Sequence, residues 1–225
     1  MCGRYAIFTE EENEELREII NNINERFKMK TGEIFPTNVA PIITGLSKNE
    51  RTANLFKWGF PNYRQSSGVI INARCETLHE KPTFRKLLTK GRCLVPASGF
   101  YEWKTIEKRK EKYLIRTTSD KLMYFAGLYN NFTDKNGLPF TSFVIITTEA
   151  NSQMSQIHTR MPVILSGAEA KLWMNAKNPK NMSNTDTNTN TNTNTNTNIN
   201  SSSVSTDISR LLKPYADELI FEKVG

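Results

Sequence analysis

Apolar positions in the first thirty residues follow a helical period. After Thr9, the apolar side chains recur three or four residues apart, at Leu16, Ile19, Ile20, Ile23 and Phe27. This spacing places them on one face of an α-helix. Thr9 and Glu12 have the spacing of a capping box, in which the two side chains satisfy the first backbone N–H groups. The pattern predicts an amphipathic helix whose apolar face joins the core.

After residue 36 the pattern changes to short β-rich runs. They are Ile42–Thr44, Asn54–Trp58, Val69–Asn72, Cys93–Val95, Tyr113–Thr117, Met123–Leu128, Phe140–Thr147 and Met161–Leu165. Phe84–Lys90 predicts a short helix that ends at Gly91, and Ser166–Met174 predicts a second one with Ser166 and Glu169 as its capping box. Many short strands with few helices indicate an α+β domain, built on a bent, mostly antiparallel sheet or open barrel.

Residues from about Ala176 to Thr206 lack this pattern. Thr185–Asn198 is nearly pure Thr and Asn, and a Ser cluster follows at Ser201–Ser203. So few side chains can be buried here that we expect a disordered loop, which costs little extra closure entropy. A spacer or partner-binding role is the alternative. Apolar positions return at Ile208–Leu212 and Leu219–Phe221, so the whole chain, 1–225, is expected to form one domain interrupted by this loop.

Charge and composition narrow the function classes. The formal net charge of +7 and the pI of about 9.3 favour a polyanionic partner, with nucleic acid first and an anionic membrane second. No apolar run approaches the roughly 18 residues of a membrane span, and no secretory signal opens the chain. Cys2, Cys75 and Cys93 form no C-x-x-C pair, which fits a reducing, intracellular compartment. With His79 and His158 as the two histidines, we expect no zinc site.

The second residue offers unusual chemistry. Removal of Met1 is favoured when the next side chain is small, so the mature chain is expected to begin with Cys2. Its α-amine has an ordinary pKa of roughly 7.7–8.0 and its thiol one of about 8.5. Such a pair can capture an aldehyde twice, first through nitrogen as a Schiff base and then through sulfur as a thiazolidine. The alternative is an incidental residue on a frayed terminus.

Three further segments carry polar residues that a fold alone does not require. Asn72 and Arg74 follow an apolar strand and share a face if the strand continues; a turn with a solvated ion pair is the alternative. Glu102 stands between two aromatic residues, where burial raises a carboxyl pKa and prepares the group for proton transfer. Trp103 can stack a base or fill the core. His158 has a pKa suited to either a catalytic or a structural role.

Six strings resemble the SRAP family in the family's order, from Cys2 to about Met174. They are M-C-G-R-Y at Met1, P-T-N-V-A-P at Pro36, W-G-F at Trp58, N-A-R-C-E-T at Asn72, R-C-L-V-P-A-S-G-F-Y-E-W at Arg92 and I-H-T-R-M-P at Ile157. The resemblance implies covalent capture of abasic sites in single-stranded DNA through Cys2, by a monomer inside the cell, with no cofactor, no metal and no membrane. It leaves replication partners open, and the Thr/Asn tract departs from the family pattern.

The resemblance also implies residue roles. Asn72 is expected to orient the amine and the sugar, Glu102 to promote ring opening and proton transfer, and His158 to protonate the Schiff base. The residues expected to contact DNA are Arg4, Arg74 and Arg160 at phosphates, Trp58 and Trp103 at bases, and Thr147 near the lesion.

Two other functions remain open from the sequence. A thiol peptidase or hydrolase could use Cys2 with His158, and members of the family have been described as putative peptidases. A peptide substrate gives no reason for several arginines to converge. A purely non-covalent single-strand binder would not need Cys2.

Overall fold

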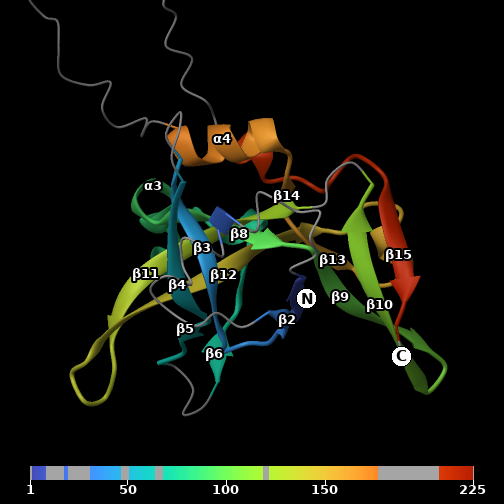
Figure 1. Ribbon diagram of the computed structural model, residues 1–225, viewed down its shortest axis with the longest axis horizontal. Coiled ribbons are helices and arrows are strands. Elements are labelled where there is room, and N and C mark those ends of the chain that lie inside the picture. Colours follow the sequence, from blue (N-terminus) through green and yellow to red (C-terminus); the bar gives the residue numbers. More distant parts are fainter. Residues whose placement is uncertain are drawn as a thin grey trace, which may run out of the picture.

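Strands dominate the computed structural model, which describes residues 2–8, 18–19, 31–46, 51–63, 68–118, 122–176 and 208–224. Figure 1 shows two main sheets side by side. The helix predicted after Thr9 lies outside the described residues except for Glu18 and Ile19, which are helical, with Ile19 buried. The predicted disordered tract also lies outside them, apart from Ala176. None of the described helices is long and apolar enough to cross a membrane.

The first sheet holds the amino terminus. Its strand order is β15 (Leu219–Lys223), β10 (Arg109–Thr117), β9 (Gly99–Ile106), β1 (Tyr5–Ile7) and β2 (Gly32–Ile34), and all neighbours are antiparallel. Tyr5 pairs with Ile34 on one side and Phe100 on the other. Because β1 is hydrogen-bonded on both sides and fully buried, the segment that follows Cys2 is fixed in the sheet.

The second sheet closes on itself. β12 (Pro139–Glu149), β11 (Met123–Thr133), β8 (Arg92–Ala97), β3 (Val39–Leu46) and β4 (Arg51–Trp58) pair in that order, and β4 returns to β12 in parallel. The result is a closed, five-stranded mixed barrel. The predicted α+β class and bent, mostly antiparallel sheet are confirmed, and the parallel β4–β12 pairing adds the closure.

Short strands extend the barrel wall. β7 (Asn72–Arg74) runs parallel to β12, while β13 (Arg160–Pro162) and β14 (Ile164–Leu165) pair antiparallel with β12 and β11. The strand predicted at 161–165 is therefore split at Val163, whose N–H donates to Ile146 and whose carbonyl accepts from Ala126. A separate two-stranded sheet consists of β5 (Phe60–Pro61) and β6 (Val69–Ile70).

The helices are short and peripheral. The described ones are η1 (Cys75–Thr77), α2 (Pro82–Arg85), α3 (Leu87–Lys90), η2 (Met154–Gln156), α4 (Gly167–Asn175) and η4 (Ile208–Leu211). The predicted helix at 84–90 is thus two short helices that meet at Lys86. Gly91 does end α3, and its lack of a side chain admits the Tyr129 carbonyl, which would lie 2.3 Å from a Cβ.

Helix α4 confirms its predicted capping box. Glu169 N donates to Ser166 Oγ at 3.3 Å, and Ser166 N donates to Glu169 Oε2 at 3.0 Å. The helix buries Trp173, whose indole N–H donates to the Cys93 carbonyl on β8 at 3.0 Å. Arg92 donates to the Trp173 and Ala176 carbonyls as well, so the contacts of α4 extend to Ala176.

Candidate functional site

Cys2 is fully buried at the entrance to β1, and its Sγ donates to the Arg4 carbonyl at 3.9 Å. A frayed terminus is therefore excluded as the setting of this residue. Burial raises the pKa of the Cys2 thiol well above its usual range, and the negative charge of Glu102 raises it further. The sequence alone did not reveal this desolvation. The thiol needs a base when it reacts.

Asn72 holds the backbone of Cys2 directly. Its Nδ2 donates to the Cys2 carbonyl at 2.8 Å, a contact between residues seventy positions apart. The parallel pairing of β7 with β12 fixes Asn72 opposite Ile145. The Asn72 Oδ1 is buried and has no hydrogen-bond partner in the described part of the chain. This buried amide oxygen can therefore accept a hydrogen bond from a donor group placed beside Cys2.

Glu102 lies on β9 and is 4% exposed. Burial raises the pKa of its carboxyl group to about 7, which confirms the direction expected from its aromatic neighbours. The carboxyl group is therefore populated in both protonation states near neutral pH. Because it also raises the thiol pKa through its charge, Glu102 lies within electrostatic reach of Cys2. A group with this pKa can both accept and donate a proton.

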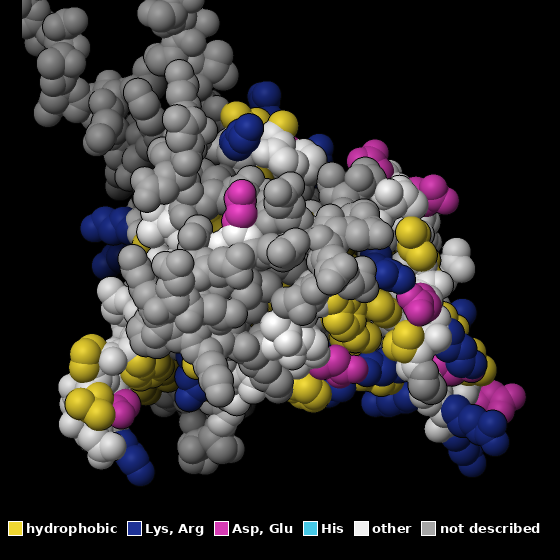
Figure 2. All heavy atoms as spheres, viewed as in Figure 1, with side chains coloured by type: hydrophobic (Ala, Val, Ile, Leu, Met, Phe, Trp, Pro, Cys, Tyr) yellow, Lys and Arg dark blue, Asp and Glu magenta, His cyan; other side chains and the backbone are white. Residues whose placement is uncertain are grey.

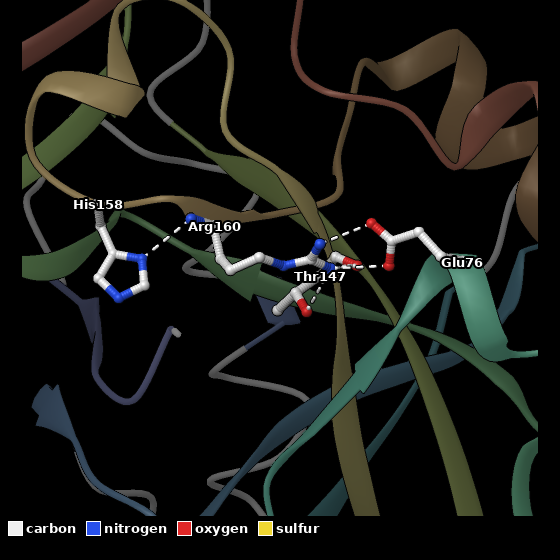
Figure 3. Close-up of polar contacts among 4 residues, drawn as sticks. All are labelled: Glu76, Thr147, His158 and Arg160. Atoms are coloured by element: carbon white, nitrogen blue, oxygen red, sulfur yellow. Dashed lines mark hydrogen bonds and ion pairs between the residues drawn. The ribbon is translucent and has the colours of Figure 1, made fainter.

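His158 lies across an open cavity from β9. Glu102, Trp103, Thr105, Lys110 and His158 line this cavity, whose volume is about 430 Å³. The backbone N–H of Arg160 donates to His158 Nδ1 at 3.0 Å, as drawn in Figure 3. The neutral imidazole therefore carries its proton on Nε2. Burial lowers the pKa of His158, so this neutral form dominates at pH 7.

The side chain of Arg160 points away from His158 and binds Glu76 with two parallel hydrogen bonds (Figure 3). Nη1 donates to Oε1 at 2.6 Å and Nη2 to Oε2 at 3.0 Å, while Nη2 also donates to the Thr147 carbonyl at 2.8 Å. This geometry joins η1, β12 and β13. The Arg160 hydrogen bonds lower the pKa of Glu76.

These contacts change two expected roles. The terminal nitrogens of Arg160 are committed to Glu76 and Thr147 rather than open to a phosphate. Thr147 is fully buried, and its carbonyl and hydroxyl oxygens accept hydrogen bonds from Arg160, so in this structure it positions Arg160. Sequence reasoning did not single out Glu76, because its partner Arg160 lies 84 residues away along the chain.

A second ion-pair cluster surrounds Arg4. Its Nη1 donates to Glu33 Oε2 at 3.1 Å, and Lys112 donates to the other oxygen of Glu33. Burial raises the pKa of Glu33, but hydrogen bonds from Lys112 and Arg4 lower it overall. The Arg4 guanidinium lies 4.0 Å from the ring centroid of Phe35 and 5.0 Å from that of Trp103. Sequence reasoning missed Glu33, Phe35 and Lys112, because nothing local links them to Arg4.

Trp58 and Arg74, two other residues predicted to contact DNA, differ in their exposure. Trp58 is fully buried, stacks on Phe143 and donates its indole N–H to the Ile71 carbonyl at 3.0 Å. It therefore belongs to the core, and we correct the expectation that it holds a base. Arg74 is exposed at the end of β7 and has no ion-pair partner among the described residues. It remains available to a phosphate.

The structure thus gathers four predicted residues from four separate segments. A hydrogen bond joins Asn72 to Cys2, charge couples Cys2 to Glu102, and one cavity joins Glu102 to His158. In the described ranges, no group of three His, Cys, Asp or Glu residues could hold a metal ion. The other two cysteines are free as well, and Cys93 is a buried thiol whose pKa is raised by desolvation.

Several known proteins resemble this chain in sequence or fold. The family model "SOS response associated peptidase (SRAP)" matches residues 1–211. The chain is 41% identical over 189 residues to "Abasic site processing protein YoqW" of Bacillus subtilis, covering 79% of this chain and 82% of that protein. It is 28% identical over 178 residues to "Abasic site processing protein YedK" of Escherichia coli, covering 77% and 79%. A crystal structure of a Bacteroides thetaiotaomicron protein matches with a TM-score of 0.73 at 23% identity, covering 100% of this chain and 92% of that one. This last likeness concerns the fold alone.

Proposed function

This chain belongs to the SRAP family, and from that membership we propose that it is an abasic site processing protein. We infer that Cys2, freed of Met1, captures the open-chain aldehyde of an abasic site in single-stranded DNA. The printed names of the relatives support the substrate class, and the basic net charge of +7 supports a polyanionic partner. The DNA damage response is the context that this chemistry implies.

The proposed reaction has two bond-forming steps. The α-amine of Cys2 adds to the aldehyde carbon, and the resulting carbinolamine loses water to give a Schiff base. The thiol sulfur then adds to the same carbon and its proton ends on the amine nitrogen, which closes a thiazolidine. The adduct therefore has the mass of protein plus DNA minus one water. The second step is intramolecular, which favours it entropically.

The site supplies a proton-transfer group for each step. Glu102, with a pKa of about 7, can protonate the departing hydroxyl and then accept the thiol proton. That base is required because burial keeps the Cys2 thiol protonated. His158 offers an Nε2–H donor on the cavity wall. Asn72 fixes the Cys2 carbonyl and offers its buried Oδ1 to a donor on the amine or sugar.

The observation that carries the proposal is the hydrogen bond from Asn72 to the carbonyl of Cys2. It fixes Cys2, the residue that becomes terminal once Met1 is removed, next to an acceptor without a partner in the described structure and close to a carboxyl group with a near-neutral pKa. Removal of Met1 then exposes the Cys2 amine at this fixed position, where it can attack before the thiol acts.

The same site disfavours the thiol peptidase. A cysteine nucleophile that acts as a thiolate needs a lowered pKa, usually from a neighbouring cation. Here burial and Glu102 both raise the pKa of the Cys2 thiol. A reaction opened by the amine avoids this barrier, because the imine carbon is in place before the thiol must lose its proton.

The test mixes purified protein lacking Met1 with single-stranded DNA that bears one abasic site. We expect a band that survives denaturation and an intact mass equal to protein plus DNA minus one water. The matched control carries an uncleavable residue before Cys2, which turns the amine into an unreactive amide while leaving the thiol. Normal adduct formation by this extended protein would rule out the mechanism. Peptide cleavage without nucleic acid would favour the peptidase instead.

A further inference from the structure

Cations around the site fall into two groups. Arg4 and Lys112 share Glu33, and Arg160 is held by Glu76, so these charges are already neutralised within the protein. Lys110 differs from them, since it lines the cavity beside Glu102 and forms no ion pair with any described residue. A cation without a counter-ion at the mouth of a reactive cavity is available to an anionic ligand.

Lys110 is the inner end of a basic hairpin formed by β9 and β10. Thr105 pairs with Lys110 and Ile106 with Arg109, and the chain turns at Glu107, whose φ of 54° is left-handed. All residues from 105 to 110 are exposed. Figure 2 shows Lys and Arg side chains gathered at the lower right, where Figure 1 places the end of this hairpin.

Few acidic groups offset this charge. Glu111 accepts from Lys223 and Tyr113, so it is already paired. In the exposed stretch 105–110, Glu107 is the one acidic residue, and it is outnumbered by Lys108, Arg109 and Lys110. The hairpin end therefore presents a net positive charge to solvent.

We propose that this hairpin end, Lys108 to Lys110, binds the phosphate backbone of the DNA strand that flanks the reacting nucleotide. The inference rests on the proposed function, because the cavity lined by Glu102 and His158 is where the lesion would lie. Lys110 contacts the phosphate nearest the cavity, and Arg109 and Lys108 contact the strand farther out.

The length of the hairpin end is compatible with contact to a DNA strand that continues out of the cavity. At about 3.3 Å per residue, the hairpin end extends the basic surface less than about 10 Å beyond Lys110. This distance is close to the Debye length of about 8 Å at physiological ionic strength, so the charges act together with the cavity. Arginine offers a forked donor and lysine a point charge, and both are suited to phosphate oxygens. Continuity with the cavity favours a nucleic acid strand over an acidic protein surface.

The test compares two triple variants with the same loss of charge. One carries Lys108→Gln, Arg109→Gln and Lys110→Gln. The matched control carries Lys90→Gln, Lys135→Gln and Lys171→Gln, which are exposed cations on α3, the β11–β12 turn and α4. The dissociation constant is measured against salt with undamaged single strands of about 20 and about 5 nucleotides. Melting curves check that all three proteins remain folded.

We expect the hairpin variant to bind the long strand about tenfold to a hundredfold more weakly. Its slope of log affinity against log salt should fall by about 2, because each single-strand phosphate contact contributes roughly 0.7. The loss should be smaller with the short strand. Equal losses in the two variants, equal losses on both strands, or displacement of the DNA by polyglutamate of equal charge would each overturn the proposal.

Undamaged DNA keeps this result separate from the chemistry of Cys2. If wild-type protein forms no adduct with abasic DNA, the proposed function fails, whatever the hairpin does. If it forms the adduct while the hairpin variant matches its control, the hairpin proposal alone fails.

Discussion

Three glutamates distinguish the buried interior of the site, around Glu102, from its more exposed rim, around Glu33 and Glu76. Glu102 is almost fully buried, and burial raises its pKa to about 7. Glu33 and Glu76 lie at the rim, where hydrogen bonds from cationic side chains lower their pKa values. The residue type is the same, but desolvation determines the first case and pairing the other two.

The interior and the rim therefore have different functions in the site. The interior retains protonatable groups at a cost in stability, as expected for functional positions. At the rim, Glu76 fixes Arg160, whose backbone N–H in turn sets the tautomer of His158. The interior is thus suited to chemistry and the rim to geometry.

The largest effect should come from Cys2, at the centre of the interior. Cys2→Ala removes the thiol and should abolish the denaturation-resistant adduct, while Cys2→Ser should leave an imine or a weaker ring that is readily lost. The control is Cys75→Ala, which removes a half-buried thiol outside the proposed reaction and should retain the adduct. Denaturing gels and intact mass measure the outcome. A stable adduct with Cys2→Ala would show that sulfur is not required.

Glu102→Gln should separate the chemical step from DNA binding. The substitution keeps the shape of the side chain but removes the proton-transfer group, so adduct formation should slow by about 10²–10⁴-fold. DNA affinity should change far less. Single-turnover rates and binding isotherms distinguish these effects, and equal losses in both would assign Glu102 a structural role.

The same variant has a defined pH dependence of stability. In the folded protein the Glu102 pKa is raised from 4.5 to about 7, so ionisation disfavours folding as pH rises through this window. The penalty is absent below pH 4.5 and complete above about pH 7. Glu102→Gln should therefore raise the free energy of unfolding by about 2–3 kcal/mol at pH 8 and leave it nearly unchanged near pH 4. Urea unfolding at both pH values measures this, and a pH-independent difference would contradict it.

At the rim, Glu76→Gln should act more weakly. It removes the charged partner of Arg160 and should cost about 1 kcal/mol of stability, because Glu76 is 41% exposed and solvent screens the pair. The lowered pKa of Glu76 means that wild type loses this contribution in acid, where the carboxylate is protonated. Adduct formation should slow by less than tenfold. Glu80→Gln, an exposed acid on the same segment, is the control, and an equal effect there would remove the special role of Glu76.

The smallest effect should come from the Thr/Asn-rich tract. Replacing residues 177–206 with a short linker should leave melting and adduct formation unchanged, because the composition offers little to bury. The deletion starts after Ala176, since the carbonyl of that residue accepts from Arg92. Loss of cooperative melting in the shortened protein would show that the tract packs against the domain.

Sequence reasoning predicted features that depend on short spacings and missed features that depend on distant segments. Alternating apolar runs predicted most strands, and Ser166 with Glu169 predicted the cap of α4, because both signals are local. Residue chemistry singled out Cys2, Asn72, and Glu102. The sequence did not predict β1 or its place between β2 and β9, since pairing partners far along the chain carry no local signature.

By itself, therefore, the sequence determined the α+β class, the family resemblance and the reactive groups, because these depend on residue type and short spacings. Only the tertiary structure decided how those groups are used. It closed the barrel through β4 and β12, buried Trp58 in the core, and paired Arg160 with Glu76. The pKa of Glu102 and of the Cys2 thiol also depended on it. The physical reason is that desolvation and ion pairing are set by neighbours brought together from distant segments.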